Sequence, residues 1–498
     1  MPTRHVDVLI VGAGLSGIGA GYFLTTQCPR KSFAILEGRE RLGGTWDLFR
    51  YPGVRSDSDM FTLGYSFRPW TDAKAIADGA SILKYIRETA AAFGIDKKIQ
   101  YNTRVKNAAW SSETASWTVD VEHGAERETE RLTCNFLFMC SGYYNYQAGY
   151  TPAFKGAESF KGRIVHPQKW TDDIDYAGKR VVVIGSGATA VTLVPALAEK
   201  AAHVTMLQRS PTYVVSRPSA DASADKIRKR LPAKLAHSIV RWKNVLWGMY
   251  VYRLSKKRPE GMKQFIVNGV QAALGPDFDV KTHFTPTYNP WDQRLCLIPD
   301  GDLFTAIKDG RASVVTDHIE TFTEGGIKLK SGAEVPADLI VTATGLDLLV
   351  LGDVKLSVDG RAIDPGQAMT YRGMMYSDVP NMAVATGYTN ASWTLKCDLT
   401  CDYVCRMLNY MDRHGYTQCT PRQNDPSVRA EPWVDFSSGY IVRSRDKFPK
   451  QGNKVPWKLH QNYARDVLAL RFGSINDGVI EYKSTAATTA VGHQQQLS

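Results

Sequence analysis

Two stretches of the chain repeat one pattern of apolar and polar positions. Residues 6–11 and 180–184 are short apolar runs, each followed at once by closely spaced glycines. A longer stretch of apolar and small residues comes next, at 15–24 and again at 188–197. This order is typical of a buried parallel strand, a tight turn and a helix that covers the sheet. The pattern therefore predicts two strand–turn–helix units.

The first glycine turn has the spacing of a dinucleotide-binding motif. Gly12 makes the tight turn, Gly14 lets a pyrophosphate approach the backbone, and Gly17 lets the helix pack closely on the strand. The N–H groups and positive dipole end of that helix attract phosphates. Glu37 stands twenty residues after Gly17, where an acid hydrogen-bonds a ribose and repels a 2′-phosphate. We therefore expect FAD or NAD at this turn, and not NADP.

The second turn has the same spacing and a different preference. Gly185, Gly187 and Ala190 take the three glycine positions, and the next apolar run ends in Gln208 and Arg209. An arginine in place of the acid can pair with a 2′-phosphate, so we expect NADPH here. The turns are 173 residues apart (from 12 to 185), which requires separate domains that face one another.

Two later apolar runs, residues 135–142 and 337–345, each indicate a buried strand that ends in a small-residue turn. Such strands close each sheet of a two-dinucleotide flavoprotein and pass the chain to the other domain. The predicted fold class is α/β: two Rossmann-like dinucleotide-binding domains, for FAD and NADP, with a nested helical insertion. The predicted bounds are 1–147 (FAD domain, first part), 148–215 (NADP domain, first part), 216–291 (helical insertion), 292–345 (NADP domain, second part) and 346–498 (FAD domain, second part, and a polar C-terminal tail).

Charge changes the picture in one segment. The formal net charge is +11, and residues 225–263 hold twelve Lys or Arg against two acids, a net +10. Trp242, Trp247, Tyr250 and Tyr252 are interleaved with them. Two interpretations stay open: a solvated helical insertion with its apolar face on the core, as most charge runs are, or a weak contact with an anionic membrane surface. We expect no nucleic-acid partner.

The eight cysteines form no C-x-x-C pair, so we expect neither a metal site nor a redox disulfide. Cys397, Cys401 and Cys405 recur at helical spacing, which predicts a buried face of one helix. The chain opens without the pattern of a signal peptide, and no apolar run reaches the roughly 20 residues that span a bilayer. These features favour a reducing cytoplasm, with peripheral membrane association left open. They do not indicate whether the protein is a monomer or dimer.

An FAD domain that faces an NADPH domain indicates hydride transfer into a flavin. The electrons can then go to a disulfide, to another carrier or to oxygen, and without a paired-cysteine motif oxygen is the better interpretation. Residues 43–57, GGTWDLFRYPGVRSD, and 160–173, FKGRIVHPQKWTDD, bear on this choice.

Both segments resemble the fingerprints of the type I Baeyer–Villiger monooxygenases, which are class B flavoprotein monooxygenases. The matching positions are Gly43, Gly44, Trp46, Tyr51, Pro52, Gly53 and Asp57, then Phe160, Gly162, His166 and Trp170. Thr171 stands where the family usually has Pro or Asp, and flavin-containing monooxygenases share most of this second motif. The resemblance covers nearly the whole chain and marks 160–173 as a hinge between the two nucleotide domains.

The resemblance implies NADPH- and O2-dependent oxidation of a small ketone to an ester or lactone through a C4a-peroxyflavin, with sulfoxidation of thioethers or thioamides. Arg294 matches the family's catalytic arginine, whose cation stabilises an anionic oxygen adduct, and Asp57 matches the acid that holds it. Gln293 stands where many relatives have Lys, so NADPH preference would rest on Arg209. His166 is either a catalytic hinge residue or a core histidine bonded to a carbonyl.

The same resemblance implies the cofactor contacts. Those to FAD are Gly12, Gly14, Ser16, Gly17, Glu37, Gly44, Thr45, Trp46, Asp47, Leu48, Asp57 and Val105. Those to NADP are Arg55, Ser56, Gly185, Ser186, Gly187, Ala188, Thr189, Ala190, Gln208 and Arg209. Two alternatives remain: an enzyme that mainly oxygenates sulfur or nitrogen, and a flavin-loaded redox sensor that docks through the basic segment.

Overall fold

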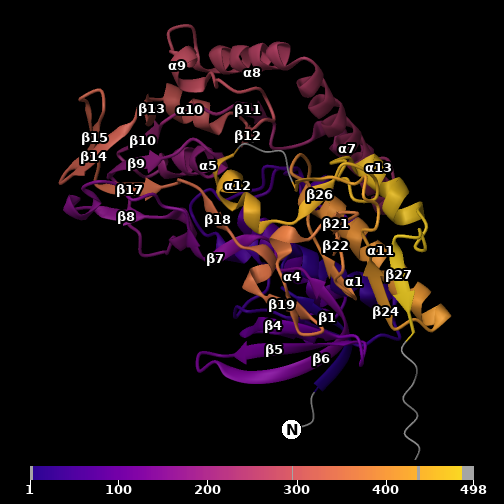
Figure 1. The fold of residues 1–498 in the computed structure, drawn as a ribbon. Helices are drawn as coiled ribbons and strands as arrows, with labels where there is room; N and C mark the ends of the chain where they lie inside the picture. Colours follow the sequence, from indigo (N-terminus) through magenta and orange to yellow (C-terminus); the bar gives the residue numbers. More distant parts are fainter. Residues whose placement is uncertain (1–3, 294, 434–437, 485–498) are drawn as a thin grey trace, which may run out of the picture.

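The computed structural model describes residues 4–293, 295–433 and 438–484. It contains two main sheets, and in each of them one strand leads into a glycine turn (Figure 1). The first sheet has nine strands in the order β20-β19-β4-β5-β6-β1-β2-β3, and β23 pairs with β6. Their bounds are β1 Arg4–Val11, β2 Phe33–Leu36, β3 Ile99–Gln100, β4 Thr103–Ser111, β5 Ser116–His123, β6 Glu128–Met139, β19 Lys355–Val358, β20 Arg361–Ile363 and β23 Met382–Val384.

Apolar burial explains why these strands form. All four residues of β2 are buried, and the last four of β1 are buried as well, because helices cover one face of the parallel part and apolar residues of β4 and β5 pack on the other. Helix α1 (Leu15–Gln27) packs against α11 (Trp393–His414) and α4 (Gly79–Ala92). Strands β19, β20 and β23 come from the second half of the chain, so both halves build this sheet.

The second sheet is wholly parallel and lies apart from the first (Figure 1). Its order is β13-β10-β9-β17-β8, with bounds β8 Arg163–Val165, β9 Arg180–Ile184, β10 His203–Gln208, β13 Ala312–Thr316 and β17 Leu339–Thr342. Helices α5 (Ala188–Leu197) and α10 (Asp302–Lys308) pack on it. A meander follows β13: β14 Ile319–Thr323, β15 Gly326–Leu329 and β16 Glu334–Pro336. Together the two sheets confirm the predicted α/β fold class with two Rossmann-like units.

Two connections join the sheets, and they pair with each other. Strand β7 (Tyr144–Gly149) leaves the first sheet, β18 (Leu346–Leu348) returns from the second, and they run antiparallel. Because the chain connects the two sheets through these strands, any movement of one sheet relative to the other must also displace this two-stranded linker.

A helical insertion arches over the second sheet at the top of Figure 1. It contains α6 (Ala222–Arg228), α7 (Ala233–Lys257), α8 (Pro259–Leu274) and α9 (Val280–Phe284), between the paired strands β11 (Val214–Arg217) and β12 (Cys296–Pro299). Helix α7 runs down the outer side and meets α13 (Tyr463–Asp466). Within the described ranges, no helix combines the length and the apolar character that crossing a membrane requires.

The remaining elements belong to neither main sheet nor the insertion. They are α2 Thr45–Leu48, α3 Met60–Leu63, α12 Gly439–Ser444 and the strand pairs β21 Thr370–Tyr371 with β22 Met375–Tyr376, β24 Gln418–Pro421 with β27 Ile480–Lys483, and β25 Ala430–Pro432 with β26 Lys450–Gly452. Cys397, Cys401 and Cys405 all lie buried on α11, which confirms the predicted helix face. The predicted C-terminal tail lies outside the described residues.

Candidate active site

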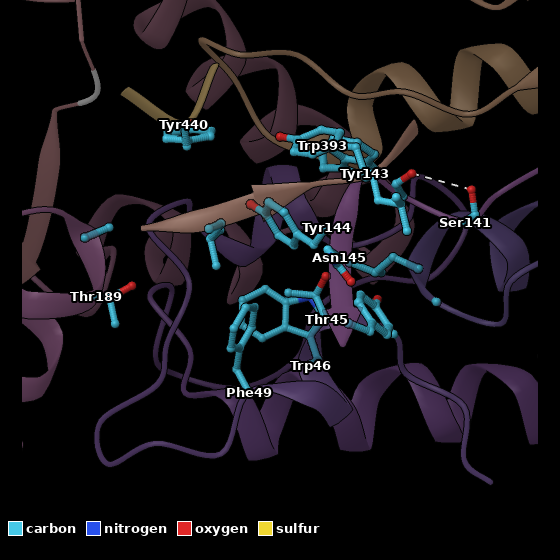
Figure 2. A pocket seen from close by; sticks show the side chains of 18 of the residues that line it. Thr45, Trp46, Phe49, Ser141, Tyr143, Tyr144, Asn145, Thr189, Trp393 and Tyr440 are labelled. Carbon is cyan, nitrogen blue, oxygen red and sulfur yellow. Dashed lines mark hydrogen bonds between the residues drawn. The ribbon is translucent and has the colours of Figure 1, made fainter. Parts of the chain in front are cut away.

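One cavity of about 620 Å³ lies where the two sheets meet, and both glycine turns line it. Gly12 and Gly14 approach from the first sheet, and Ser186 and Gly187 approach from the second. Figure 2 shows Trp46 and Phe49 on one side, Tyr143 and Trp393 on the other, and Thr189 with Tyr440 toward one end. A cavity bounded by two such turns has room for the reacting ends of two dinucleotides.

Glu37 is held at the first turn by the backbone. The N–H of Ala13 donates to its Oε2 at 2.8 Å, and the N–H of Arg39 donates to its Oε1 at 3.0 Å. Burial raises the pKa of Glu37, and these two hydrogen bonds oppose the rise. Each carboxylate oxygen has a lone pair left for a further donor, so the side chain is oriented to receive ribose hydroxyls.

The fingerprint loop supplies one wall of the cavity. Gly44, Thr45 and Trp46 line it at the start of the loop, and Arg55, Ser56 and Asp57 line it at the end, as does Val105 of β4. An added Cβ at Gly44 would come 3.0 Å from the Cα of Gly14, so the loop and the first turn meet backbone to backbone.

Asp47 and Leu48 do not line the cavity, although they were predicted to contact FAD. Asp47 is buried and forms ion pairs with Arg39 at 2.8 Å, Arg87 at 3.4 Å and Arg50 at 3.5 Å. Its carboxylate therefore holds the loop together from behind, and its direct contact with FAD stays a prediction.

The middle of the fingerprint, YPG, packs against the second unit. An added Cβ at Gly53 would lie 2.7 Å from the Cβ of Ala196 and 2.8 Å from the carbonyl oxygen of Thr192, both on α5. Burial raises the pKa of Tyr51 to about 12, partly offset by a hydrogen bond with Thr189. Only a residue without a side chain allows this close approach, which ties the loop to α5.

At the second turn, Ser186, Gly187, Ala188 and Thr189 line the cavity at the N-terminus of α5. Gly185 and Ala190 do not, nor does Gly17 of the first turn. These three residues lie at packing positions: a Cβ on Gly17, for instance, would come within 1.8 Å of the carbonyl oxygen of Gly12. They shape the turns from which the lining residues project.

Gln208 and Arg209 lie outside the cavity at the end of β10. The buried amide of Gln208 donates to the carbonyl oxygen of His283 at 2.7 Å and to Oγ1 of Thr316 at 2.8 Å. The amide nitrogen of Gln208 therefore already donates two hydrogen bonds within the second unit. The contact of Gln208 with NADP stays a prediction. Arg209 is exposed, and no carboxylate of the described residues forms an ion pair with it.

Two of the three predicted catalytic residues lie in the described chain. Asp57 lines the cavity, as do Gln293 and Cys296, whereas Arg294 lies outside the described residues. His166 does not line the cavity. Its Nε2 hydrogen-bonds the carbonyl oxygen of Gly345 at 3.1 Å, and its Nδ1 accepts the N–H of Gln168 at 3.2 Å.

These bonds hold the His166 ring at the linker. Burial lowers its pKa, opposed by the bond to Gly345. An added Cβ at Gly149 of β7 would meet the ring at 2.0 Å, so the ring lies against one linker strand and bonds the residue that precedes the other.

Sequence reasoning assigned no role to the aromatic wall opposite the fingerprint loop. Tyr143 and Trp393 lie 5.2 Å apart between ring centroids, and the indole of Trp393 donates to Oγ of Ser16 at 2.9 Å. The dense aromatic spacing of residues 143–146 and 387–393 is the signal that could have indicated them. Other aromatic members of the lining are Tyr144, Tyr146, Tyr288, Tyr388 and Tyr440.

The hydroxyl of Tyr388 is hydrogen-bonded to a buried ion pair formed by Asp466 and Lys396. Its hydroxyl donates to Oδ2 of Asp466 at 2.6 Å, and Nζ of Lys396 donates to the same oxygen at 2.9 Å. Burial raises the pKa of Tyr388 well above its usual value, and the Asp466 charge raises it further. The phenol therefore stays protonated, and its orientation at the cavity is fixed.

Comparisons with known proteins also indicate a flavin- and dinucleotide-binding protein. Residues 10–76 match the NAD(P)-binding Rossmann-like domain model, and residues 64–269 match the flavin-binding monooxygenase-like model. The FAD-containing monooxygenase EthA of Mycobacterium tuberculosis is 53% identical, with 98% of this chain and 100% of that protein covered. The chain belongs to the FAD-containing monooxygenases.

Two solved structures share the fold of this FAD-containing monooxygenase. A steroid monooxygenase bound to NADP has a TM-score of 0.75 at 22% identity, covering 97% of this chain and 100% of that one. Cyclohexanone monooxygenase from Rhodococcus sp. Phi1, bound to NADP+, has a TM-score of 0.75 at 20% identity, with 97% and 100% covered. The predicted resemblance to flavoprotein monooxygenases is confirmed by the relative EthA, and these two structures show that the fold is shared.

Proposed function

We propose that this protein is an NADPH- and O2-dependent flavin monooxygenase that converts ketones to esters or lactones and oxidises thioethers as a second reaction. The observation that carries the proposal is the single cavity lined by both glycine turns, because it lets a nicotinamide donor meet a flavin. The similar folds of a steroid monooxygenase and a cyclohexanone monooxygenase, both bound to NADP, support the choice of cosubstrate and substrate class.

The residues of the first turn fit FAD. Gly14 and Gly44 meet backbone to backbone, so no side chain of theirs projects into the cavity that they line. Glu37 offers lone pairs to a ribose, and the N-terminus of α1 offers N–H groups to a pyrophosphate. Bound flavin supplies the electrons that activate oxygen. Trp46, Tyr143 and Trp393 line the same space, and their apolar rings would limit the access of water to a bound flavin.

The second turn fits a nicotinamide dinucleotide. Ser186 to Thr189 surround the N-terminus of the ten-residue helix α5, where backbone N–H groups suit a pyrophosphate. Arg209 is exposed one residue beyond β10, within the region where a 2′-phosphate would lie. Arg55 lines the cavity while paired with Asp302 of α10, so its guanidinium is oriented before any ligand binds.

We assign oxygen insertion to Arg294 and Asp57. The guanidinium would stabilise the negative charge that develops on the substrate oxygen, and the carboxylate, on the cavity wall, would hold that cation. His166 would act as a positioning residue, because it bonds the linker at Gly345 and lies against Gly149.

Arg294→Ala tests this assignment. The variant should still oxidise NADPH and reduce its flavin, while ketone conversion falls by about 10²- to 10³-fold, the usual effect of losing one oxyanion donor. Arg361→Ala, an exposed arginine on β20, is the matched control and should match the unmodified enzyme. Full ketone conversion by Arg294→Ala would contradict the assignment.

Product identification separates the alternative, a heteroatom oxygenase. The enzyme is given a simple methyl ketone and a thioether in competition, and esters and sulfoxides are measured. Sulfoxide formation without any ester would favour the alternative. If neither substrate accelerates NADPH consumption, the proposed oxidation of ketones and thioethers is wrong, and the redox-sensor interpretation is favoured.

A further inference from the structure

Helix α7 presents a stripe of large apolar side chains to solvent. Its members recur every three or four residues on one side of the helix, and each is between 38% and 58% exposed: Leu235, Ile239, Trp242, Leu246 and Tyr250. Trp247, 57% exposed, lies beside them. From first to last the stripe is about 22 Å long at the usual helical rise. Scattered exposed apolar residues are common, but a contiguous row of this size marks an interaction surface.

The opposite side of α7 is already packed. Val240 and Val245 are buried there, and the guanidinium of Arg241 donates to the carbonyl oxygen of Gly64 at 2.7 Å and to Asp398 of α11 at 3.3 Å. The helix is therefore apolar on two sides, and the core accounts for only one. Because Arg241 fixes the rotation of the helix, the stripe points outward permanently.

Basic side chains flank the stripe at both ends. Of the twelve Lys and Arg between 225 and 263, four form ion pairs with described carboxylates: Arg228, Arg241, Lys243 and Lys256. Lys263 donates to the carbonyl oxygen of Pro286. The other seven are exposed and have no carboxylate partner among the described residues: Lys226, Lys229, Arg230, Lys234, Arg253, Lys257 and Arg258.

Arg253 and Lys257 continue the line of the stripe itself, three and seven positions after Tyr250. One side of α7 is thus apolar for four turns and basic for the last. Long basic side chains can extend along such a surface and place their charges at phosphate level while the apolar groups insert.

We propose that the exposed stripe of α7 docks on an anionic lipid bilayer, with the helix lying in the plane of the interface. Trp, Leu and Tyr on one face with Lys and Arg around them is the chemistry that binds such a surface. A second copy of the chain is a poorer occupant, because it would bring together two clusters of seven cations that have no carboxylate partner in the described ranges. The proposal rests on α7 and does not depend on the proposed function.

Figure 1 shows that α7 forms an outer edge of the molecule, away from the two sheets. Trp242 contacts Tyr463 of α13 at 5.3 Å between ring centroids, so α13 borders the stripe. The cavity residues lie elsewhere on the chain, and none of the stripe residues lines the cavity. Docking through α7 would therefore leave the cofactor turns uncovered.

Vesicle co-sedimentation of the full-length protein tests the proposal. Partitioning into phosphatidylglycerol–phosphatidylcholine vesicles should exceed partitioning into pure phosphatidylcholine by at least tenfold, and high salt should weaken it. Leu246→Ser with Trp247→Ser should reduce binding at least tenfold, and Arg253→Glu with Lys257→Glu should abolish the preference for anionic lipid. Val455→Ser replaces an apolar residue outside α7 that is exposed at least as much as Leu246 and Trp247, and this variant should bind like the unmodified protein.

Melting temperature and NADPH oxidation should be unchanged in all these variants, which separates lost docking from lost folding. Hydrogen exchange of the unmodified protein gives a second measure: anionic vesicles should slow exchange in 233–257. Equal binding to both lipids, no binding, or full binding by Leu246→Ser with Trp247→Ser would overturn the proposal. So would a dimer, seen by light scattering, that the same double substitution dissociates, because a second copy would then cover the stripe.

Discussion

One methyl group at Gly187 tests whether the second turn binds the phosphates of NADPH. Gly187 precedes α5 with φ −78° and ψ −176°, a conformation that alanine adopts readily. An added Cβ would have no protein atom within 4 Å, while Gly187 itself lines the cavity. Gly187→Ala therefore changes the space available to a ligand without creating a clash in the protein.

The expected stability change is small. Alanine is a poorer residue than glycine at this helix-capping position by about 0.5–1 kcal/mol. It also restricts the unfolded chain, which stabilises the folded state by about 0.4–1 kcal/mol. The two effects nearly cancel. A pyrophosphate that must contact the bare backbone would lose that approach, and we expect the KM for NADPH to rise at least tenfold, or about 1.4 kcal/mol of binding free energy.

Gly185→Ala is the matched control, two residues earlier in the same turn. Gly185 has φ +131°, and an added Cβ would lie 2.4 Å from the carbonyl oxygen of Ala343. Backbone strain of about 1–3 kcal/mol and a similar cost of overpacking should destabilise the protein. The first substitution should thus affect the cofactor and the second the fold.

The assay measures three quantities on each variant: melting temperature, flavin content by absorbance, and initial rates of NADPH oxidation. Gly187→Ala should match the unmodified protein in the first two and differ in KM alone. If its KM for NADPH is unchanged in a folded, flavin-loaded enzyme, the second turn does not bind the pyrophosphate and the reasoning is refuted.

Three further substitutions test single side chains. Arg209→Ala should reduce the ratio of kcat/KM for NADPH over NADH at least tenfold, because one cation facing a 2′-phosphate is lost; an unchanged ratio would refute the assignment. Burial lowers the pKa of His237 to about 4, so stability should fall by about 2 kcal/mol between pH 7.5 and 5, as the unfolded state binds the proton first. Urea unfolding of His237→Gln should show a smaller pH dependence, and an identical one would count against this cause. Arg241→Met should destabilise by about 3–5 kcal/mol, since it leaves Asp398 buried without its cation; a midpoint shift below about 1 kcal/mol would contradict that reasoning.

The glycine turns could be predicted from sequence because their chemistry is local. Gly12, Gly14 and Gly17 lie within six residues. Gly12 has φ +104°, and an added Cβ at Gly17 would clash with the carbonyl oxygen of Gly12, so the backbone itself requires glycine at these two positions. The nearby helix and the acid at Glu37 follow in fixed order. The two sheets and the insertion could be predicted for the same reason, because local patterns of apolar residues indicate their strands and helices.

The cavity wall could not be predicted, because it depends on pairs that are far apart in the chain. Tyr388 is held by Asp466, 78 residues later, and Trp393 bonds Ser16, 377 residues earlier. Periodicity shows which side chains share a face, and says nothing about which distant partner they meet. The α7 stripe is a similar case: apolar residues on two sides of the helix do not reveal which side is exposed.

Two glycines at the junction of the sheets, Gly53 and Gly149, indicate how the two units keep a fixed relative position at the site. Gly53 brings the fingerprint loop against α5, and Gly149 brings β7 against the His166 ring, in both cases so closely that a methyl group would not fit. Contacts between a backbone and a packed partner cannot slide as flexible side chains do, because they have only one close-packed arrangement. A rotation of the second sheet must therefore displace the loop and the linker together. Since that loop continues into Arg55 and Asp57 at the cavity, the geometry couples the position of the nicotinamide domain to the residues proposed to carry out oxygen insertion.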